Sequence, residues 1–150
     1  MTGSGKKKTF QTVTRELWEK LYNRKQSAWL TVLSGSMRPL IPVDAKVLVQ
    51  KVPIDAIGFG DIILFKKDDV LMSHWVIGIL KQAEKRSFLQ QGTLSSTPGL
   101  VREDLVLGKV VCVQTAHREV HLADLMQRFR SLKTVLRLRL YYELKRLFRQ

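Results

Sequence analysis

Two serines in a short turn-like segment, Ser34 and Ser36, are the side chains whose type and spacing best suit covalent chemistry. Gly35 lies between them and lets a substrate backbone come close. Pro39 stiffens the exit from the turn. A serine on such a turn acts as a nucleophile when a base reaches it from elsewhere in the fold. Because Ser-Gly-Ser triplets are common in surface loops, the rest of the chain must supply the argument for catalysis.

The candidate for the base that this chemistry needs is His74, the only histidine within the β-rich part of the sequence, although a lone histidine more often has a surface or core role. We expect it to begin a strand over His74–Leu80. His117 and His121 lie where the strand pattern gives way to a helical one, and we interpret both as structural. Cys112 lies in an apolar run and is expected in the core. No cysteine and histidine cluster has metal-ligand spacing, so we expect no metal and no cofactor.

Six short runs rich in β-branched residues predict the strands that must position these side chains. They are Trp29–Leu33, Lys46–Lys51, Asp61–Phe65, His74–Leu80, Ser87–Gln90 and Leu107–Val113. Turn signals separate most of them, and no helical pattern intervenes. The sequence therefore predicts a mainly β fold, a compact antiparallel sheet or barrel.

Helical patterns flank the β-rich part on both sides and complete the expected organisation. We predict a basic tail and a short N-terminal helix within residues 1–27, and a β-rich domain over 28–115. A basic amphipathic helical extension is expected over 116–150, with its helical pattern beginning near His121. No apolar run approaches the roughly 20 residues that span a bilayer. The basic N-terminus lacks an apolar continuation, so no signal peptide is expected and a cytoplasmic location is predicted.

The chain carries 26 basic and 13 acidic residues, a formal net charge of +13, and this excess favours anionic partners. Arginine and lysine gather on the amphipathic segment 121–150, opposite leucine and phenylalanine. That pattern favours peripheral attachment to an anionic membrane surface, on the inner face of the membrane, over reading of a nucleic-acid groove. Nucleic-acid binding remains the less favoured alternative.

Several segments, taken in order, resemble one known family. They are Ser-x-Ser-Met-x-Pro from Ser34, the strand Val47–Lys51, Gly60-Asp61-Ile62-Ile63-Leu64-Phe65, His74-x-Val76-Ile77-Gly78, Gly92, and Leu107-Gly108-Lys109-Val110-Val111. This series resembles the signal peptidase superfamily, which also contains the self-cleaving SOS repressors. It is most similar to small bacterial members without a membrane span. The resemblance covers roughly residues 30–113 and implies the antiparallel β fold of that superfamily.

The resemblance also implies roles for individual residues. Ser36 matches the nucleophile, and Ser34 matches a hydroxyl that helps to hold the oxyanion. His74 matches the general base of the Ser/His type. Thr93 stands at the supporting position, where the family usually carries an aspartate after glycine. Two further departures are Trp75 after the histidine, where arginine is common, and the absence of Gly-Asp before the second strand.

Three function classes follow from these observations. The first is a serine endopeptidase that cleaves a leader or propeptide bound as an extended strand, with small side chains before the scissile bond. The second is a catalytically inactive relative that binds a peptide or partner in the same groove, because Thr93 cannot supply the charge of the family acid. The third is a basic nucleic-acid-binding protein, although residues 1–27 are too short for the separate DNA-binding domain of the repressors.

Overall fold

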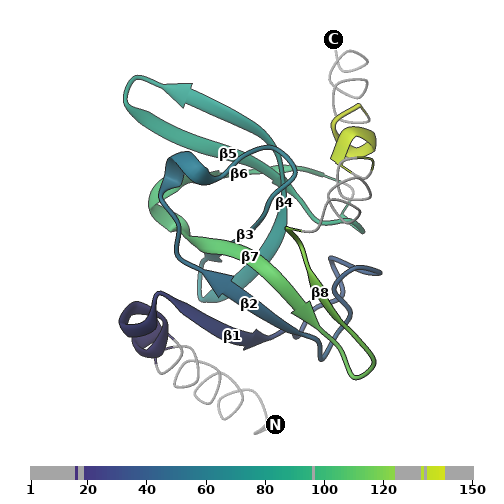
Figure 1. The fold of residues 1–150 in the computed structure, drawn as a ribbon. Helices are drawn as coiled ribbons and strands as arrows, with labels where there is room; N and C mark the ends of the chain where they lie inside the picture. Colours follow the sequence, from purple (N-terminus) through teal and green to yellow (C-terminus); the bar gives the residue numbers. More distant parts are fainter. Residues whose placement is uncertain (1–15, 17–18, 96, 124–132, 134, 141–150) are drawn as a thin grey trace, which may run out of the picture.

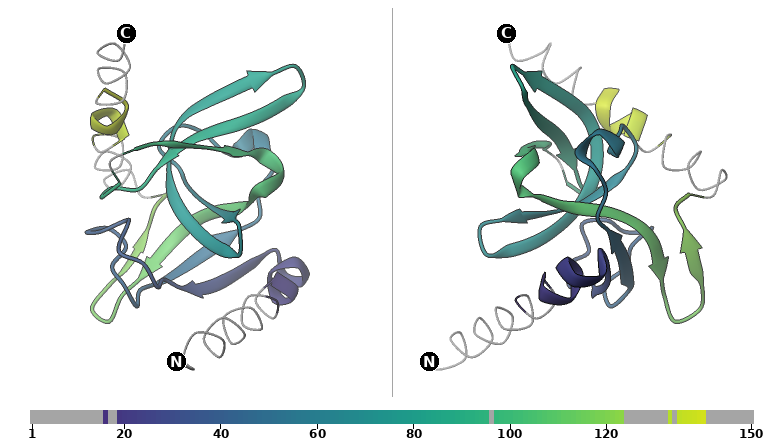
Figure 2. Two further views of the ribbon diagram at one scale, coloured as in Figure 1. Left: turned by 180° about the vertical axis from the view of Figure 1, so that it is seen from behind. Right: turned by 60° about the vertical axis from the view of Figure 1, so that its left-hand side comes forward.

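The body of the protein is one curled antiparallel sheet of eight strands, as the computed structural model shows for residues 16, 19–95, 97–123, 133 and 135–140. The strands are β1 (Ser27–Thr31), β2 (Lys46–Gln50), β3 (Ile62–Lys67), β4 (Val70–Gln82), β5 (Lys85–Gln91), β6 (Gly99–Arg102), β7 (Val106–Gln114) and β8 (Glu119–His121). Seven of them follow the order β1-β2-β7-β3-β4-β5-β6, and β8 pairs with β7. The sheet curls into a half-barrel with a short helix near each end of the chain (Figures 1 and 2). The predicted mainly β, antiparallel fold is confirmed.

All six predicted strands are present, but the sequence missed two others and the true length of β4. β4 begins at Val70, so His74 lies inside the strand rather than at its start. The segment 99–102, for which no strand was predicted, forms β6. The prediction that helix begins near His121 is wrong at that point, because Glu119–His121 pairs with β7 as β8. The sheet thus extends as far as His121, into the first residues of the segment 116–150 that we expected to be a helical extension.

Two hydrophobic clusters lie on opposite sides of β4, because successive side chains of a strand point to opposite faces. Trp75 and Ile77 belong to the larger cluster, which also holds Met37 and Ile41. Val76 belongs to the smaller one, whose other buried members are Ile57, Ile63, Phe65, Phe88 and Val101. Complete burial of such a side chain is worth about 1.5–3 kcal/mol. Because side chains alternate between the two faces of β4, His74 lies on the same face as Val76 and can contact only side chains on that face.

The helix over residues 19–25 is attached to the sheet through Tyr22. Its hydroxyl donates a hydrogen bond of 2.6 Å to the carbonyl oxygen of Leu107. Burial raises the pKa of Tyr22 to about 12, so the phenol stays protonated and keeps this bond throughout the neutral range. The adjacent Leu21 is exposed.

The second helical stretch, residues 135–140, packs on the larger cluster. Val135 is fully buried and Leu138 contacts the same cluster. The Arg139 guanidinium lies over the Phe59 ring, 5.6 Å from its centroid. The basic tail 1–8 and most of the amphipathic segment 121–150 lie outside the described residues, as does the membrane contact expected of that segment.

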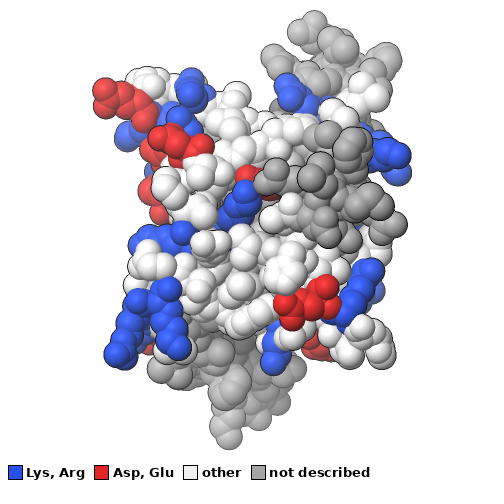
Figure 3. All heavy atoms as spheres, in the orientation of Figure 1, with Lys and Arg blue, Asp and Glu red and all other residues white. Residues whose placement is uncertain are grey.

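No helix among the described residues is long and apolar enough to cross a membrane. On the face drawn in Figure 3, lysine and arginine side chains are scattered among uncharged and acidic groups. They form no continuous basic stripe on that face.

Candidate active site

The turn that carries the two serines is anchored to the hydrophobic core by buried side chains. Met37 and Ile41 point into the larger cluster and are almost inaccessible to solvent. Two backbone hydrogen bonds close the turn, from Arg38 N–H to the Gly35 carbonyl (3.2 Å) and from Ile41 N–H to the Met37 carbonyl (3.0 Å). The Arg38–Pro39 peptide bond is cis. Ser36, next to the anchored Met37, is therefore held at a defined place while remaining partly accessible.

The segment after β5 presses against the serine turn and holds it near β4. The backbone N–H of Leu94 donates to the Ser36 carbonyl oxygen at 3.0 Å. Gly92 allows this approach: a Cβ atom there would lie 2.9 Å from the Ser36 carbonyl oxygen and 2.9 Å from His74 Nε2. Both distances are too short for a carbon contact, so any larger residue would push the two apart. Glycine at position 92 is thus a requirement of the site.

The predicted nucleophile and base meet in the structure. His74 Nε2 lies 3.2 Å from Ser36 Oγ, although the two residues are 38 positions apart in the chain. Ser34 Oγ lies 3.3 Å from Ser36 Oγ. When Ser36 donates its proton toward His74, the Ser34 hydroxyl is the donor of that second contact. The three predicted residues thus form one connected set.

The other imidazole nitrogen is bound by a residue that the sequence did not indicate, Gln90. His74 Nδ1 forms a short hydrogen bond with Gln90 Oε1, and both side chains are buried. An amide oxygen only accepts, so Nδ1 carries the proton. In a neutral imidazole, Nε2 then has a free lone pair that faces the Ser36 hydroxyl. This is the tautomer that a general base needs.

The strand register explains why Gln90 reaches His74. Trp75 is opposite Gln91 and Val76 is opposite Gln90 in the β4–β5 ladder. His74 and Val76 point to the same face, so Gln90 is the diagonal neighbour of His74 on that face. Diagonal neighbours on paired strands lie within reach of long side chains.

His74 is 6% exposed and its surroundings favour the neutral form. Burial lowers its pKa below the ordinary value, the hydrogen bond to Gln90 opposes that shift, and the positive charge of Lys67 adds to it. The Phe65 ring meets the imidazole edge to face, with 5.8 Å between centroids. A neutral imidazole at pH 7 is therefore the expected state.

Thr93 stands where the family that the sequence resembles carries an acid, but the hydrogen bonds of His74 are made with Ser36 and Gln90. The Thr93 hydroxyl accepts a hydrogen bond of 2.9 Å from the indole N–H of Trp75. Trp75 points to the larger cluster, on the opposite side of β4 from His74. Thr93 thus supports Trp75, the neighbour of His74, and Gln90 is the residue hydrogen-bonded to His74 itself. With the β4–β5 register known, Gln90 is identified as the partner of His74, because it lies two residues before Gly92 and therefore on the same face. The sequence alone does not reveal that register.

No protein-family model matches this chain, and no curated protein matches it either. The chemical interpretation of the site therefore stands on its geometry.

Proposed function

We propose that the protein is a serine endopeptidase with Ser36 as nucleophile, His74 as general base and Gln90 as the residue that orients the base. The observation that supports this most strongly is the unbroken chain of contacts from Ser36 Oγ through His74 to Gln90. His74 Nε2 takes the proton from Ser36 Oγ as the oxygen attacks the peptide carbonyl carbon. His74 then gives that proton to the leaving amine. In the second half of the reaction, His74 takes a proton from water as the water attacks the acyl carbon, and returns the proton to Ser36 Oγ as the acyl group leaves.

Ser34 is the proposed oxyanion donor. Its hydroxyl already lies beside Ser36 Oγ and is exposed toward solvent, so it is free to turn toward a substrate oxygen. Removal of one such donor from other serine hydrolases costs about 10²–10³-fold in rate. The Ser34→Ala variant is expected to lose activity on that scale while it keeps Ser36 and His74.

The proposed substrate is an extended peptide. β1 is the first strand of the sheet and leads directly into the serine turn, and among the described strands it pairs with β2 alone. An extended peptide that adds to this edge would gain main-chain hydrogen bonds and continue toward Ser36. Leu33 and Leu94 flank the serines and are 69% and 66% exposed. Two exposed apolar side chains beside the nucleophile favour apolar or small substrate side chains near the scissile bond.

The test is cleavage of a diverse synthetic peptide library, with products identified by mass spectrometry. The wild-type protein is expected to cut a subset of peptides, and Ser36→Ala to cut none. Ser87→Ala is the matched control, because Ser87 lies on β5 three residues from Gln90 and is expected to leave cleavage unchanged. Equal cleavage by wild type and Ser36→Ala would refute the role of Ser36.

A non-catalytic peptide-binding relative is the second candidate, and the neutral Gln90 favours it. Where a carboxylate would stabilise the imidazolium that forms during attack, an amide supplies only a hydrogen bond. Under this alternative the library yields captured peptides, equally for wild type and Ser36→Ala, and no cleavage products after long incubation.

A further inference from the structure

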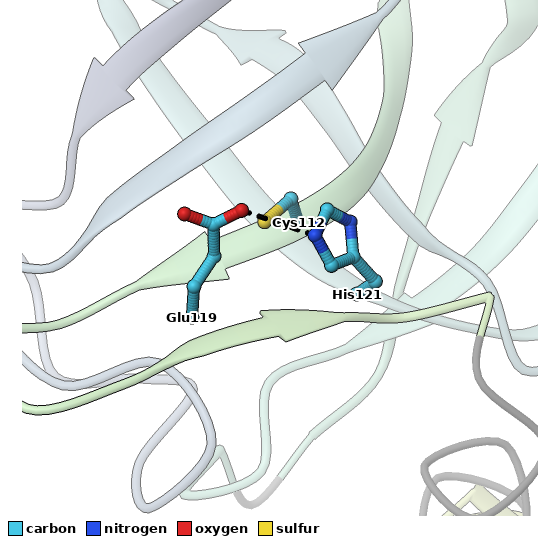
Figure 4. Close-up of side chains that lie close together, drawn as sticks. All are labelled: Cys112, Glu119 and His121. Atoms are coloured by element: carbon cyan, nitrogen blue, oxygen red, sulfur yellow. Dashed lines mark ion pairs between the residues drawn. The ribbon is translucent and has the colours of Figure 1, made fainter.

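The hairpin of β7 and β8 brings together three side chains that no step of the proposed peptidase uses. Cys112 is on β7, and Glu119 and His121 are on β8. The Cys112 sulfur, a Glu119 carboxylate oxygen and a His121 ring nitrogen all lie within 4.8 Å of one another. Figure 4 shows the three side chains converging from the two strands. The sequence patterns did not indicate this group, because Glu119 and His121 fall within the segment 116–150 that was expected to form a helical extension.

The backbone under the group is fixed by the hairpin. Cys112 is directly opposite His121 in the ladder, and Gln114 is opposite Glu119. Alternate residues of one strand share a face, so Glu119 and His121 lie on the same side as Cys112. The turn is closed by a hydrogen bond of 2.8 Å from Thr115 N–H to the Arg118 carbonyl. The three side chains are therefore held near one another by the fold itself.

Two of the three side chains in the group are exposed to solvent. Cys112 is fully buried, whereas the side chains of Glu119 and His121 are 44% and 67% exposed. Solvent thus reaches two of the three side chains directly, and a cation contacts the buried sulfur once the Glu119 and His121 side chains move apart. His121 Nε2 and Glu119 Oε1 are 3.0 Å apart. Tetrahedral zinc with bonds of about 2.0–2.3 Å places its ligand atoms about 3.3–3.8 Å from one another, so small side-chain movements would complete the geometry.

We propose that Cys112, Glu119 and His121 bind a zinc ion. A thiolate, an imidazole and a carboxylate are the three ligand types that proteins use for zinc, and a buried sulfur disfavours magnesium and calcium, which prefer oxygen. On binding, the thiol proton leaves to solvent and the sulfur becomes a thiolate. The thiolate and the carboxylate then balance the two positive charges of the ion, and His121 is neutral. A water molecule takes the fourth position.

Gln114, which is not one of the three ligands, already orients the Glu119 carboxylate. The Gln114 side-chain amide donates to Glu119 Oε2 at 3.3 Å, which leaves Oε1 directed toward the group. Partners of this kind fix the orientation of metal ligands and commonly change affinity by about 10–100-fold when removed. The ion would fasten β8 to β7 at the point from which the chain leaves the sheet toward the C-terminal helix.

The thiol contributes to the energetics of this site in a definite way. Burial raises the pKa of Cys112, and the negative charge of Glu119 raises it further. The free protein therefore holds a protonated thiol at neutral pH, and zinc must displace that proton. Two exposed basic residues lie near this end of the hairpin. Lys46 is opposite Gln114 in the β2–β7 ladder, and Arg118 directly precedes Glu119; neither is one of the three proposed ligands.

The experiment is zinc titration of the full-length wild-type protein against a competing chromophoric chelator. We expect one equivalent to bind, and a fall in affinity of tenfold or more for His121→Gln and for Glu119→Gln. His117→Gln is the matched control, because His117 is an exposed histidine of the same hairpin outside the group, and it should bind like wild type. Both ligand substitutions are at exposed side chains, so the variants are expected to fold.

Cobalt substitution reports on the sulfur directly. The wild-type protein with one equivalent of Co²⁺ is expected to show a thiolate-to-cobalt charge-transfer band that is absent from Co²⁺ in buffer. Absence of stoichiometric zinc binding, equal affinity in wild type and His121→Gln, or bound cobalt without a thiolate band would each overturn the proposal. Ser36→Ala should bind zinc normally, so failure of the peptidase proposal and failure of this one are separate results.

Discussion

Two histidines of this protein lie in contrasting surroundings. His74 is buried, and its partners Ser36 and Gln90 come from segments 38 and 16 positions away. His121 is exposed and meets Glu119 and Cys112 within a single hairpin. The first cluster exists only when the serine turn, β4 and β5 are all in place. The second needs little more than correct pairing of β7 with β8.

The partners differ in charge as well as in distance along the chain. His74 has two uncharged partners, and burial lowers its pKa, so the ring keeps a free lone pair for a proton. His121 lies against a carboxylate and beside a buried thiol, a set that gains most when a cation replaces the thiol proton. The same residue type is thus the proposed base in one region and a proposed metal ligand in the other. The difference lies in what each neighbour can donate or accept.

Among substitutions that should affect the His74 cluster but not the His121 cluster, Gln90→Leu is expected to have the largest effect on cleavage. This substitution removes the acceptor of the His74 Nδ1 proton, so the ring can turn or adopt the other tautomer. Loss of the correct tautomer costs about 10⁴-fold in a related catalytic arrangement, and we expect a fall in kcat of about 10²–10⁴-fold. Peptide cleavage assays measure this fall, with circular dichroism to establish that the variant is folded.

Gln90→Glu is the conservative counterpart. The carboxylate accepts the same hydrogen bond and adds a negative charge, so it should raise the pKa of His74 and move the acidic limb of the pH–rate profile upward while cleavage persists. Zinc affinity should not change in either Gln90 variant, and His121→Gln should not change cleavage. Wild-type activity in Gln90→Leu would show that Gln90 does not position the base.

The smallest effect is expected for Thr93→Val. The substitution keeps the shape of the side chain but removes the acceptor for the Trp75 indole N–H. An unsatisfied donor in a largely buried place costs about 1–3 kcal/mol, so the free energy of unfolding should fall by that amount. Chemical denaturation measures this loss. Cleavage by the folded variant should stay close to wild type, because Thr93 supports Trp75 on the other face of β4. A loss of activity as large as that of Gln90→Leu would show that position 93 acts on the base after all.

The fold and part of the candidate site could be predicted from the sequence. Runs of β-branched residues between turn signals identified six strands. Residue types and the family resemblance together indicated Ser36 and His74 as a pair, and the two side chains do meet. β8 is only three residues long and leaves almost no pattern. The β4–β5 hairpin turns at Ala83, which has φ = 54° and none of the Asn-Gly chemistry typical of a two-residue turn.

The missed partners follow from these missed elements. Without the β4–β5 turn there is no register, and without a register nothing distinguishes Gln90 from Gln91 or Thr93 as the neighbour of His74. Likewise, without β8 nothing brings His121 and Glu119 to Cys112. Residue types indicated which chemistry was available, and strand pairing decided which residues take part in it.

The measurement that bears most directly on the proposed mechanism is the protonation state of His74, by ¹⁵N NMR of the imidazole. The chain has three histidines, so His117→Gln and His121→Gln assign the remaining signals. We predict a neutral His74 at pH 7 with the proton on Nδ1, and a pKa below the ordinary value of about 6.5. Because the pKa of His74 is lowered in the folded state, its contribution to the free energy of unfolding is fully present above about pH 6.5. That contribution is lost as the pH falls through the folded-state pKa of His74. A proton on Nε2, or an imidazolium that persists at pH 7, would contradict the role of His74 as the base that activates Ser36.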